Sequence, residues 1–104
     1  MTLAELIQFD NQNLFLELKD FAETHTLEGV EMDISVDNDR LDFLKAQGYS
    51  ALIEADLMFF CRSDEIARHT PGSLINYDGR ECTVVNWTEN KGISCVAIAQ
   101  RRKR

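Results

Sequence analysis

The dipeptide Asp78-Gly79 constrains the fold of this 104-residue chain most, because it separates two runs that alternate apolar and polar residues. Asp-Gly in such a place is typical of a two-residue type I′ turn, in which both turn residues adopt positive φ. The flanking runs, 74–77 and 81–88, are therefore expected to form a β-hairpin. A second turn at 89–92 leads into the run 93–99, so we expect a three-stranded meander.

Two runs upstream of the meander also indicate strands. From 30 to 36, apolar residues alternate with polar and acidic ones, which predicts a half-buried strand with an acidic outer face. The next run is apolar throughout and reads Met58-Phe59-Phe60-Cys61. Met58 and Phe60 would lie on one face of a strand and the other two residues on the opposite face. We therefore expect a central strand covered on both faces, as in a small barrel or a sheet packed under helices.

The first 28 residues have the pattern of an amphipathic helix, which Gly29 would end. Thr2 and Glu5 have the spacing of a capping box, and apolar residues then recur every three or four positions. Asp10-Asn11 can break this helix and begin a second one. The apolar stripe is expected to pack against the core, and an exposed role in binding a partner is the alternative.

Two shorter helices are expected between the strands. The cluster Asp37-Asn38-Asp39 can form a turn and cap a helical piece from 40 to 47, and a variable loop over 37–49 is the alternative. After the central strand, Ser63 and the two acids that follow it have the chemistry of a helix start. Pro71-Gly72 would limit that helix to about two turns.

Together these patterns predict a single domain, residues 1–104, of the α+β class. Its β-rich core, residues 50–100, is expected to be a small β-barrel or sandwich-like antiparallel sheet with an N-terminal helix and short flanking helices. A hydrophobic content of 44% with a single Pro excludes a disordered class. Because no apolar run approaches the roughly 20 residues of a membrane span, no membrane partner is expected.

Charge is divided unevenly along the chain. Residues 1–60 carry 13 acids and 3 bases, a net −10, whereas residues 61–104 carry 5 acids and 8 bases, a net +3. Opposite charges on two parts of one small domain suit head-to-tail contact between copies, and the alternative is that both parts are simply solvated. An acidic chain of this kind favours protein partners over nucleic acid, which needs clustered Lys and Arg.

No catalytic motif is found, and the chain is not expected to be an enzyme or to hold a cofactor. There is no phosphate-binding GxxxxGK[ST], no dinucleotide-binding GxGxxG and no HExxH. The three cysteines, Cys61, Cys82 and Cys95, lack CxxC spacing and are expected to be buried thiols rather than a metal or redox site. A small hydrolase that uses His69 with Cys61 is the remote alternative.

The acids near position 40 have a spacing that partly matches a calcium loop. Asp37, Asp39 and Asp42 are spaced suitably, but Arg40 intrudes, and the Gly and terminal Glu of an EF-hand loop are missing. A solvated turn is therefore expected and not a metal site.

The order of features over residues 50–104 resembles the head-tail joining proteins, also called attachment or neck proteins, of lambda-like siphophages and their prophage relatives. A strand ending in Ser63-Asp64-Glu65-Ile66 is followed by Tyr77-Asp78-Gly79, by Cys82-Thr83-Val84-Val85, by Val96-Ala97-Ile98 and by a basic end. The resemblance implies a structural protein of the virion that joins the portal or adaptor of a DNA-filled head to the tail.

The same resemblance implies that copies assemble as a ring, with a hexamer as the expected form. DNA would pass through this ring without sequence-specific binding, and an acidic lumen would repel the DNA phosphates and let the DNA slide. The chain would be found in the host cytoplasm during assembly and then in the virion neck. The segment 37–49 is more acidic and more helical than the family pattern.

Candidate partner-binding residues are those of the acidic segment and of the basic tail, namely Asp37, Asp39, Arg40, Asp42, Arg101, Arg102, Lys103 and Arg104. Four adjacent positive charges could contact an acidic partner or phosphate, and a solvated tail is the alternative. The alternative function is a small non-enzymatic binding module that regulates another protein through its amphipathic N-terminal helix.

Overall fold

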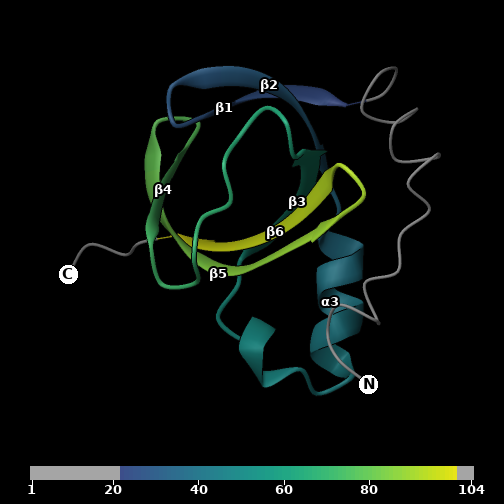
Figure 1. The fold of residues 1–104 in the computed structure, drawn as a ribbon. Helices are drawn as coiled ribbons and strands as arrows, with labels where there is room; N and C mark the ends of the chain where they lie inside the picture. The colour runs from purple at the N-terminus through teal and green to yellow at the C-terminus, as the bar shows by residue number, and fades with distance from the viewer. Residues whose placement is uncertain (1–21, 101–104) are drawn as a thin grey trace.

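The computed structural model describes residues 22–100, and the segments 1–21 and 101–104 lie outside that description. Within it, six antiparallel strands close into a barrel in the order β1-β2-β3-β6-β5-β4 (Figure 1). The strands are β1 (Glu23–Leu27), β2 (Val30–Val36), β3 (Leu57–Arg62), β4 (Leu74–Tyr77), β5 (Arg80–Asn90) and β6 (Ile93–Gln100). The helix α3 (Asn38–Ala46) and the 3-10 turn η1 (Ser50–Leu52) lie between β2 and β3. The expected small antiparallel β-barrel is confirmed.

Three two-residue turns of the same kind connect the hairpins. Their central residues are Glu28-Gly29, Asp78-Gly79 and Lys91-Gly92, and all six have φ between 48° and 87°. Positive φ at both central residues defines a type I′ turn, whose twist matches that of the strands it joins. The Asp78-Gly79 turn is confirmed, and the later turn has Lys91 where Asn or Gly would be less strained.

Each face of β3 covers its own apolar core, as the sequence predicted. Inside the barrel, Phe59 and Cys61 pack with residues from the other strands, among them the buried Trp87. On the outer face, Met58 and Phe60 pack under α3 and η1 together with Leu41, Leu44, Leu52 and Ala55. The strand is therefore central and buried on both faces, and α3 with η1 forms a layer on one side of the barrel (Figure 1).

The prediction of an N-terminal helix is wrong for residues 23–27, which the structure describes. Residues 23–27, assigned by sequence to the helical segment 1–28, form strand β1, which pairs with β2 from Glu23↔Ile34 to Leu27↔Val30. The Glu28-Gly29 turn makes this hairpin possible, whereas a helix would leave β2 without its neighbour. The remainder of the predicted helix, residues 1–21, lies outside the described residues.

The helix expected after Ser63 is also wrong. Residues 63–73 form turns and irregular chain instead. Ile66 packs against the interior core, and the His69 ring stacks on Trp87 with 5.4 Å between ring centroids. Because these contacts need an irregular path across the barrel (Figure 1), tertiary packing overrides the local helix-start signal. The helix predicted for 40–47, in contrast, is confirmed as α3.

The β1–β2 hairpin is the least firmly attached part of the barrel. It joins β4 through the single pair Leu27↔Tyr77 and joins β3 through two pairs at Ser35 and Val36. By comparison, β3 and β6 share six pairs. The contacts that Asp78 and Glu28 add at the β1–β4 seam therefore matter for closure of the barrel.

Candidate functional site

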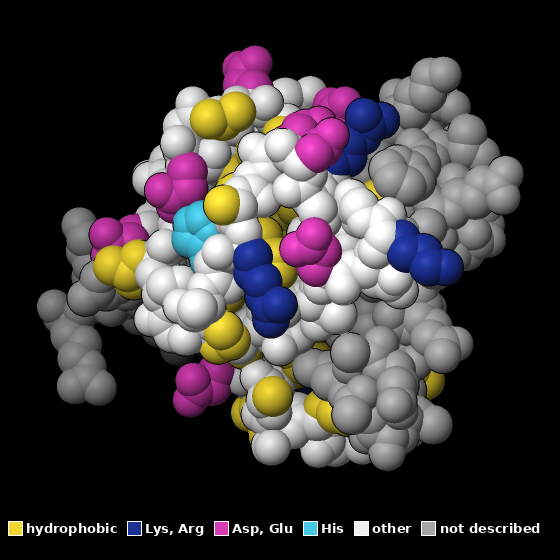
Figure 2. Space-filling model, viewed as in Figure 1, with side chains coloured by type: hydrophobic (Ala, Val, Ile, Leu, Met, Phe, Trp, Pro, Cys, Tyr) yellow, Lys and Arg dark blue, Asp and Glu magenta, His cyan; other side chains and the backbone are white. Residues whose placement is uncertain are grey.

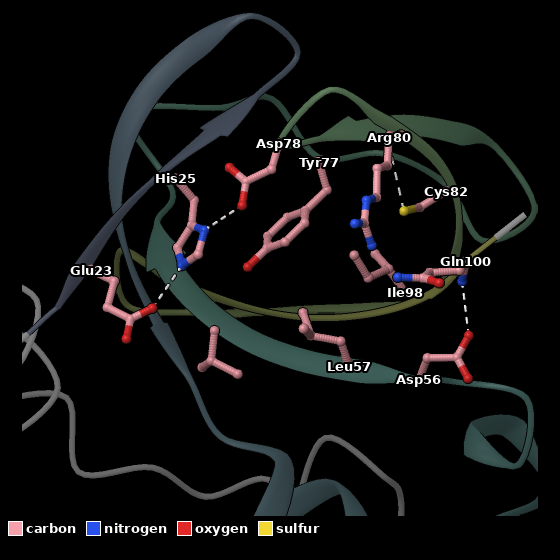
Figure 3. Close-up of a pocket in the computed structure, with 11 residues that line it drawn as sticks. Glu23, His25, Asp56, Leu57, Tyr77, Asp78, Arg80, Cys82, Ile98 and Gln100 are labelled. Carbon is pink, nitrogen blue, oxygen red and sulfur yellow. Dashed lines mark hydrogen bonds and ion pairs between the residues drawn. The ribbon is translucent and has the colours of Figure 1, made fainter.

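One mouth of the barrel is an open pocket of about 580 Å³. Side chains alternate between the two faces of a strand, so a residue two positions from a buried interior residue also faces the inside of the barrel. Most residues that line the pocket have this position. His25 lies two residues before the buried Leu27, and Gln100 lies two residues after the buried Ile98. The full lining is Glu23, His25, Val36, Asp56, Leu57, Tyr77, Asp78, Arg80, Cys82, Ile98 and Gln100. We call this pocket the mouth (Figure 3).

His25 lies between two carboxylates at the mouth. Its Nδ1 is 2.6 Å from Oδ2 of Asp78, and its Nε2 is 3.1 Å from Oε2 of Glu23 (Figure 3). Both ring nitrogens can donate only when the imidazole is protonated, so this arrangement favours the imidazolium form. The His25 ring also stacks on Tyr77, with 5.2 Å between ring centroids.

The environment of the mouth shifts several pKa values. Burial opposes protonation of His25, but hydrogen bonds to Asp78 and Glu23 outweigh it and raise the pKa of His25 above 6.5. A hydrogen bond from the backbone N–H of Thr26 lowers the pKa of Asp78, and the hydrogen bond from His25 lowers it further. Burial raises the pKa of Tyr77 to about 12 and also raises that of Cys82. At neutral pH the carboxyl of Asp78 is therefore ionised, while the phenol of Tyr77 and the thiol of Cys82 are neutral.

Acidic groups outnumber basic ones at the mouth. Glu23, Asp56 and Asp78 line it together with a single Arg, Arg80. Asp78 uses both carboxylate oxygens, one for His25 and one for the N–H of Thr26 at 2.8 Å. Glu23 and Asp56 use one oxygen each, and among residues 22–100 neither forms an ion pair with Lys or Arg. Two carboxylates at the mouth thus have acceptor oxygens to offer a ligand.

The structure places the predicted acidic residues at the start of α3, away from the barrel interior. Asp37 is the N-cap of α3, and its Oδ1 accepts a hydrogen bond from the N–H of Arg40 at 3.0 Å. The Arg40 side chain returns to Asp37 at 3.3 Å and lies over the Phe60 ring. Asp39 and Asp42 are exposed. The predicted tail residues 101–104 lie outside the described residues.

The layer formed by α3 and η1 also exposes two large apolar side chains. Phe43 on α3 is 57% exposed, and Ile53, directly after η1, is 64% exposed. Shallow hollows adjoin both residues, one lined by Asp37, Asp39 and Arg40 beside Phe43 and one by Glu54, Asp56 and Gln100 beside Ile53. We call the surface of residues 37–54 that carries Phe43 and Ile53 the α3–η1 surface.

Over the described part of the face seen in Figure 2, acidic and basic side chains are interspersed, and most apolar side chains are scattered singly. Such a distribution is ordinary for a solvated surface. We take the mouth and the α3–η1 surface as the two candidate sites.

The cysteines do not provide a nucleophile. All three are buried free thiols, as expected, and burial raises the pKa of Cys61 and of Cys95 to about 12. A thiol with so high a pKa is almost wholly protonated at neutral pH and reacts slowly. His69 contacts the carbonyl oxygen of Ala67 and stacks on Trp87. Within the described chain, no group of three or more His, Cys, Asp or Glu side chains could hold a metal ion.

The sequence did not reveal the mouth, because His25 lies in the segment predicted to be helical and Asp78-Gly79 indicated only a turn. The residues of the mouth come from all six strands, and only the closed barrel brings them together. The available signal was the alternation that places His25 with Leu27 and Tyr77 with Ile75 on inward faces, but reading it required β1 to be recognised as a strand.

Comparison with protein-family models, with curated proteins and with solved structures finds no match to this chain. In residues 22–100, no helix has the length and apolar character needed to cross a membrane.

Proposed function

We propose that the chain is a structural protein of a phage or prophage virion that joins the head to the tail as a ring. The proposal combines the resemblance over residues 50–104 with one structural observation, the α3–η1 surface. The acidic segment that holds the candidate partner-binding residues 37–42 lies in and just before α3, which stands with η1 beside the barrel.

The α3–η1 surface is held firmly on the barrel while its outer side remains open. Leu44 and Leu52 are buried in the outer core, and the Lys45 ammonium donates to the carbonyl oxygen of Ala55 at 2.6 Å. The side chain of Asn38 accepts a hydrogen bond from the N–H of Met58 on β3 at 3.2 Å. A surface held in this way loses little conformational entropy on binding, which favours association.

Phe43 and Ile53 supply apolar anchors on that surface, and acidic side chains flank them. Aromatic and aliphatic side chains near the centre of an interface contribute most of its binding energy, while a charged rim selects the partner. Asp39, Asp42 and Glu54 give the rim a negative charge. The expected partner therefore has a basic rim around an apolar hollow, as a surface of the portal, the adaptor or the tail end could present.

The test uses the DNA-filled heads and free tails of the phage or prophage whose genes lie beside that of this chain. Adding the purified chain should join heads to tails, counted by electron microscopy or by infectious titre. The double variant Phe43→Ser with Ile53→Ser should lower joining at least tenfold. Val30→Ser is the matched control, because Val30 is 54% exposed on β2, outside the α3–η1 surface.

Circular dichroism and thermal unfolding would establish that the double variant keeps its fold, as expected for residues that contribute little to the core. Full joining by a folded double variant would remove the α3–η1 surface from the proposal. A wild-type chain that binds neither heads nor tails, under conditions where they otherwise join, would overturn the proposed function itself.

A further inference from the structure

We propose that the mouth binds the basic segment Arg101–Arg104 of a second copy of this chain. The inference deepens the proposed function, on which it rests for the presence of neighbouring copies. It assigns the head-to-tail contact between copies to two defined parts of the molecule, one of them outside the described residues.

The mouth has the chemistry of a site for Lys and Arg side chains. The partly buried Leu57 and the buried Ile98 give it an apolar wall, along which the methylene chains of Lys and Arg can lie. Glu23 and Asp56 extend from opposite sides of the mouth, and each has a carboxylate oxygen that accepts no hydrogen bond from residues 22–100 (Figure 3). Arginine and lysine donate several hydrogen bonds to carboxylates and accept none, so they match these groups.

The acidic surface continues beyond the mouth along a second groove. That groove, about 330 Å³, is lined by Ile53, Glu54, Asp56, Ala99 and Gln100, and it shares Asp56 and Gln100 with the mouth. The carboxylates of Glu23, Glu54, Asp56 and Asp78 border the connected hollows and outnumber the positive groups there, which are the Arg80 guanidinium and the His25 imidazolium. The segment 101–104 carries four positive charges, so the two parts are complementary in sign.

The position of Gln100 favours a second copy over the segment's own barrel. The N–H of Gln100 donates to Oδ2 of Asp56 at 2.9 Å, which fixes the end of β6 at the rim of the mouth. Entry of the basic segment into the same mouth would require the chain to reverse directly after Gln100. The mouth of a neighbouring copy needs no reversal.

The charged groups of the mouth lie on two sides. Glu23 lies on one side with His25, and Asp56 lies on the other side beside Gln100, where the Arg80 guanidinium also lies (Figure 3). A basic segment is therefore attracted by a carboxylate on each side and is repelled by Arg80.

The experiment uses a tail variant, in which all four residues 101–104 are replaced by Glu, and a mouth variant, Glu23→Lys with Asp56→Lys. Each variant alone should associate with itself at least tenfold more weakly than the wild type, by sedimentation velocity at low salt. An equimolar mixture should associate again, because the basic segment of the mouth variant meets the intact mouth of the tail variant. A mixture that stays monomeric would overturn the inference, and so would a tail variant that associates like the wild type.

A direct binding measurement keeps the test decisive if the free wild-type chain is monomeric. A labelled peptide with the sequence of residues 97–104 should bind the tail variant, and adding Glu23→Gln with Asp56→Asn should weaken that binding at least tenfold. The matched control, Glu31→Gln with Asp33→Asn, removes the same charge from the exposed face of β2 and should not weaken it. A tail variant that does not bind the peptide contradicts the inference.

The two proposals can fail separately. If the peptide does not bind but the wild-type chain still joins heads to tails, only the tail contact is wrong. If the peptide binds and the variant mixture associates but heads and tails are never joined, the contact between copies stands and the proposed function does not.

Discussion

Asp78 connects the β4–β5 turn to β1, and we predict that replacing it loosens the weakest seam of the barrel. Its Oδ1 accepts the N–H of Thr26 at 2.8 Å, its Oδ2 accepts His25 Nδ1 at 2.6 Å, and its own N–H donates to the carbonyl oxygen of Thr26. The seam has one further register pair, Leu27↔Tyr77. Asp78 therefore supplies a large part of the hydrogen bonding that closes the barrel between β1 and β4.

The magnitude follows from these contacts. A hydrogen bond to a charged group contributes about 1.5–3 kcal/mol when it is shielded. Because the Asp78 side chain is 41% exposed, we take about 1 kcal/mol for each of its two bonds. Asp78→Ala loses both bonds and also places Ala at φ 51°, which adds about 1 kcal/mol, for a total of roughly 3 kcal/mol. Asp78→Asn keeps one acceptor and tolerates positive φ, so its expected cost is about 1 kcal/mol.

The assay is urea unfolding of wild type and Asp78→Asn at a series of pH values. The pKa of Asp78 is lowered in the fold, so its contribution is present above the unfolded value of 3.8 and is lost as pH falls through the folded pKa. The pKa of His25 is raised, so its contribution is present below 6.5 and is lost as pH rises through the folded pKa. The difference in unfolding free energy between the two proteins should therefore be largest from about pH 4 to 6.5.

A difference that stays constant from pH 3 to pH 9 would refute the reasoning, because it would show that the ion pair does not stabilise the seam. The double variant with His25→Gln should show that the two substitutions are not additive. Asp33→Asn, on the exposed face of β2, is the control and should leave the unfolding free energy within about 0.5 kcal/mol of wild type.

Three further substitutions test the two cores and the turns by equilibrium unfolding. Leu44→Ala should lower the unfolding free energy by about 2–4 kcal/mol, because it leaves a cavity in the outer core. Phe43→Ala changes an exposed residue one position earlier and should cost less than about 0.5 kcal/mol. Equal costs would contradict the assignment of Leu44 to the buried face of α3. Gly92→Ala should cost about 1–2 kcal/mol because Gly92 has φ 87°, and a neutral result would exclude the type I′ turn. Trp87→Phe should change the unfolding free energy by less than about 1 kcal/mol. The lost packing is offset because the substitution removes a buried indole N–H that has no partner in the described structure. A loss above about 3 kcal/mol would indicate that this N–H is bonded.

The sequence predicted those parts of the fold that local chemistry determines. A tight type I′ turn requires positive φ at two successive residues, and Asp78 and Gly79 both tolerate it. Met58 to Cys61 is apolar on both faces, and this pattern correctly indicated a central strand with two cores. Asp37 is a strong capping residue, and it begins α3 as expected.

Long-range packing determined the parts that were predicted wrongly. The sequence has no Gly or Pro before Gly29 to separate residues 23–28 from the preceding apolar stripe, and only the pairing of these residues with β2 makes them a strand. Ser63 begins a pattern that suits a helix, but Ile66 and His69 pack instead against the barrel interior and Trp87. The mouth depends on six strands closing together, so its composition could not be derived from neighbours in the sequence.

The most direct test of the proposed function is electron microscopy of the purified chain mixed with DNA-filled heads and, separately, with free tails from the same phage or prophage. The account predicts a closed ring of this chain at the portal vertex or at the head-proximal end of the tail, and its loss with Phe43→Ser and Ile53→Ser. Heads and tails that remain bare at a saturating concentration of folded chain, while they still join to one another, would contradict it.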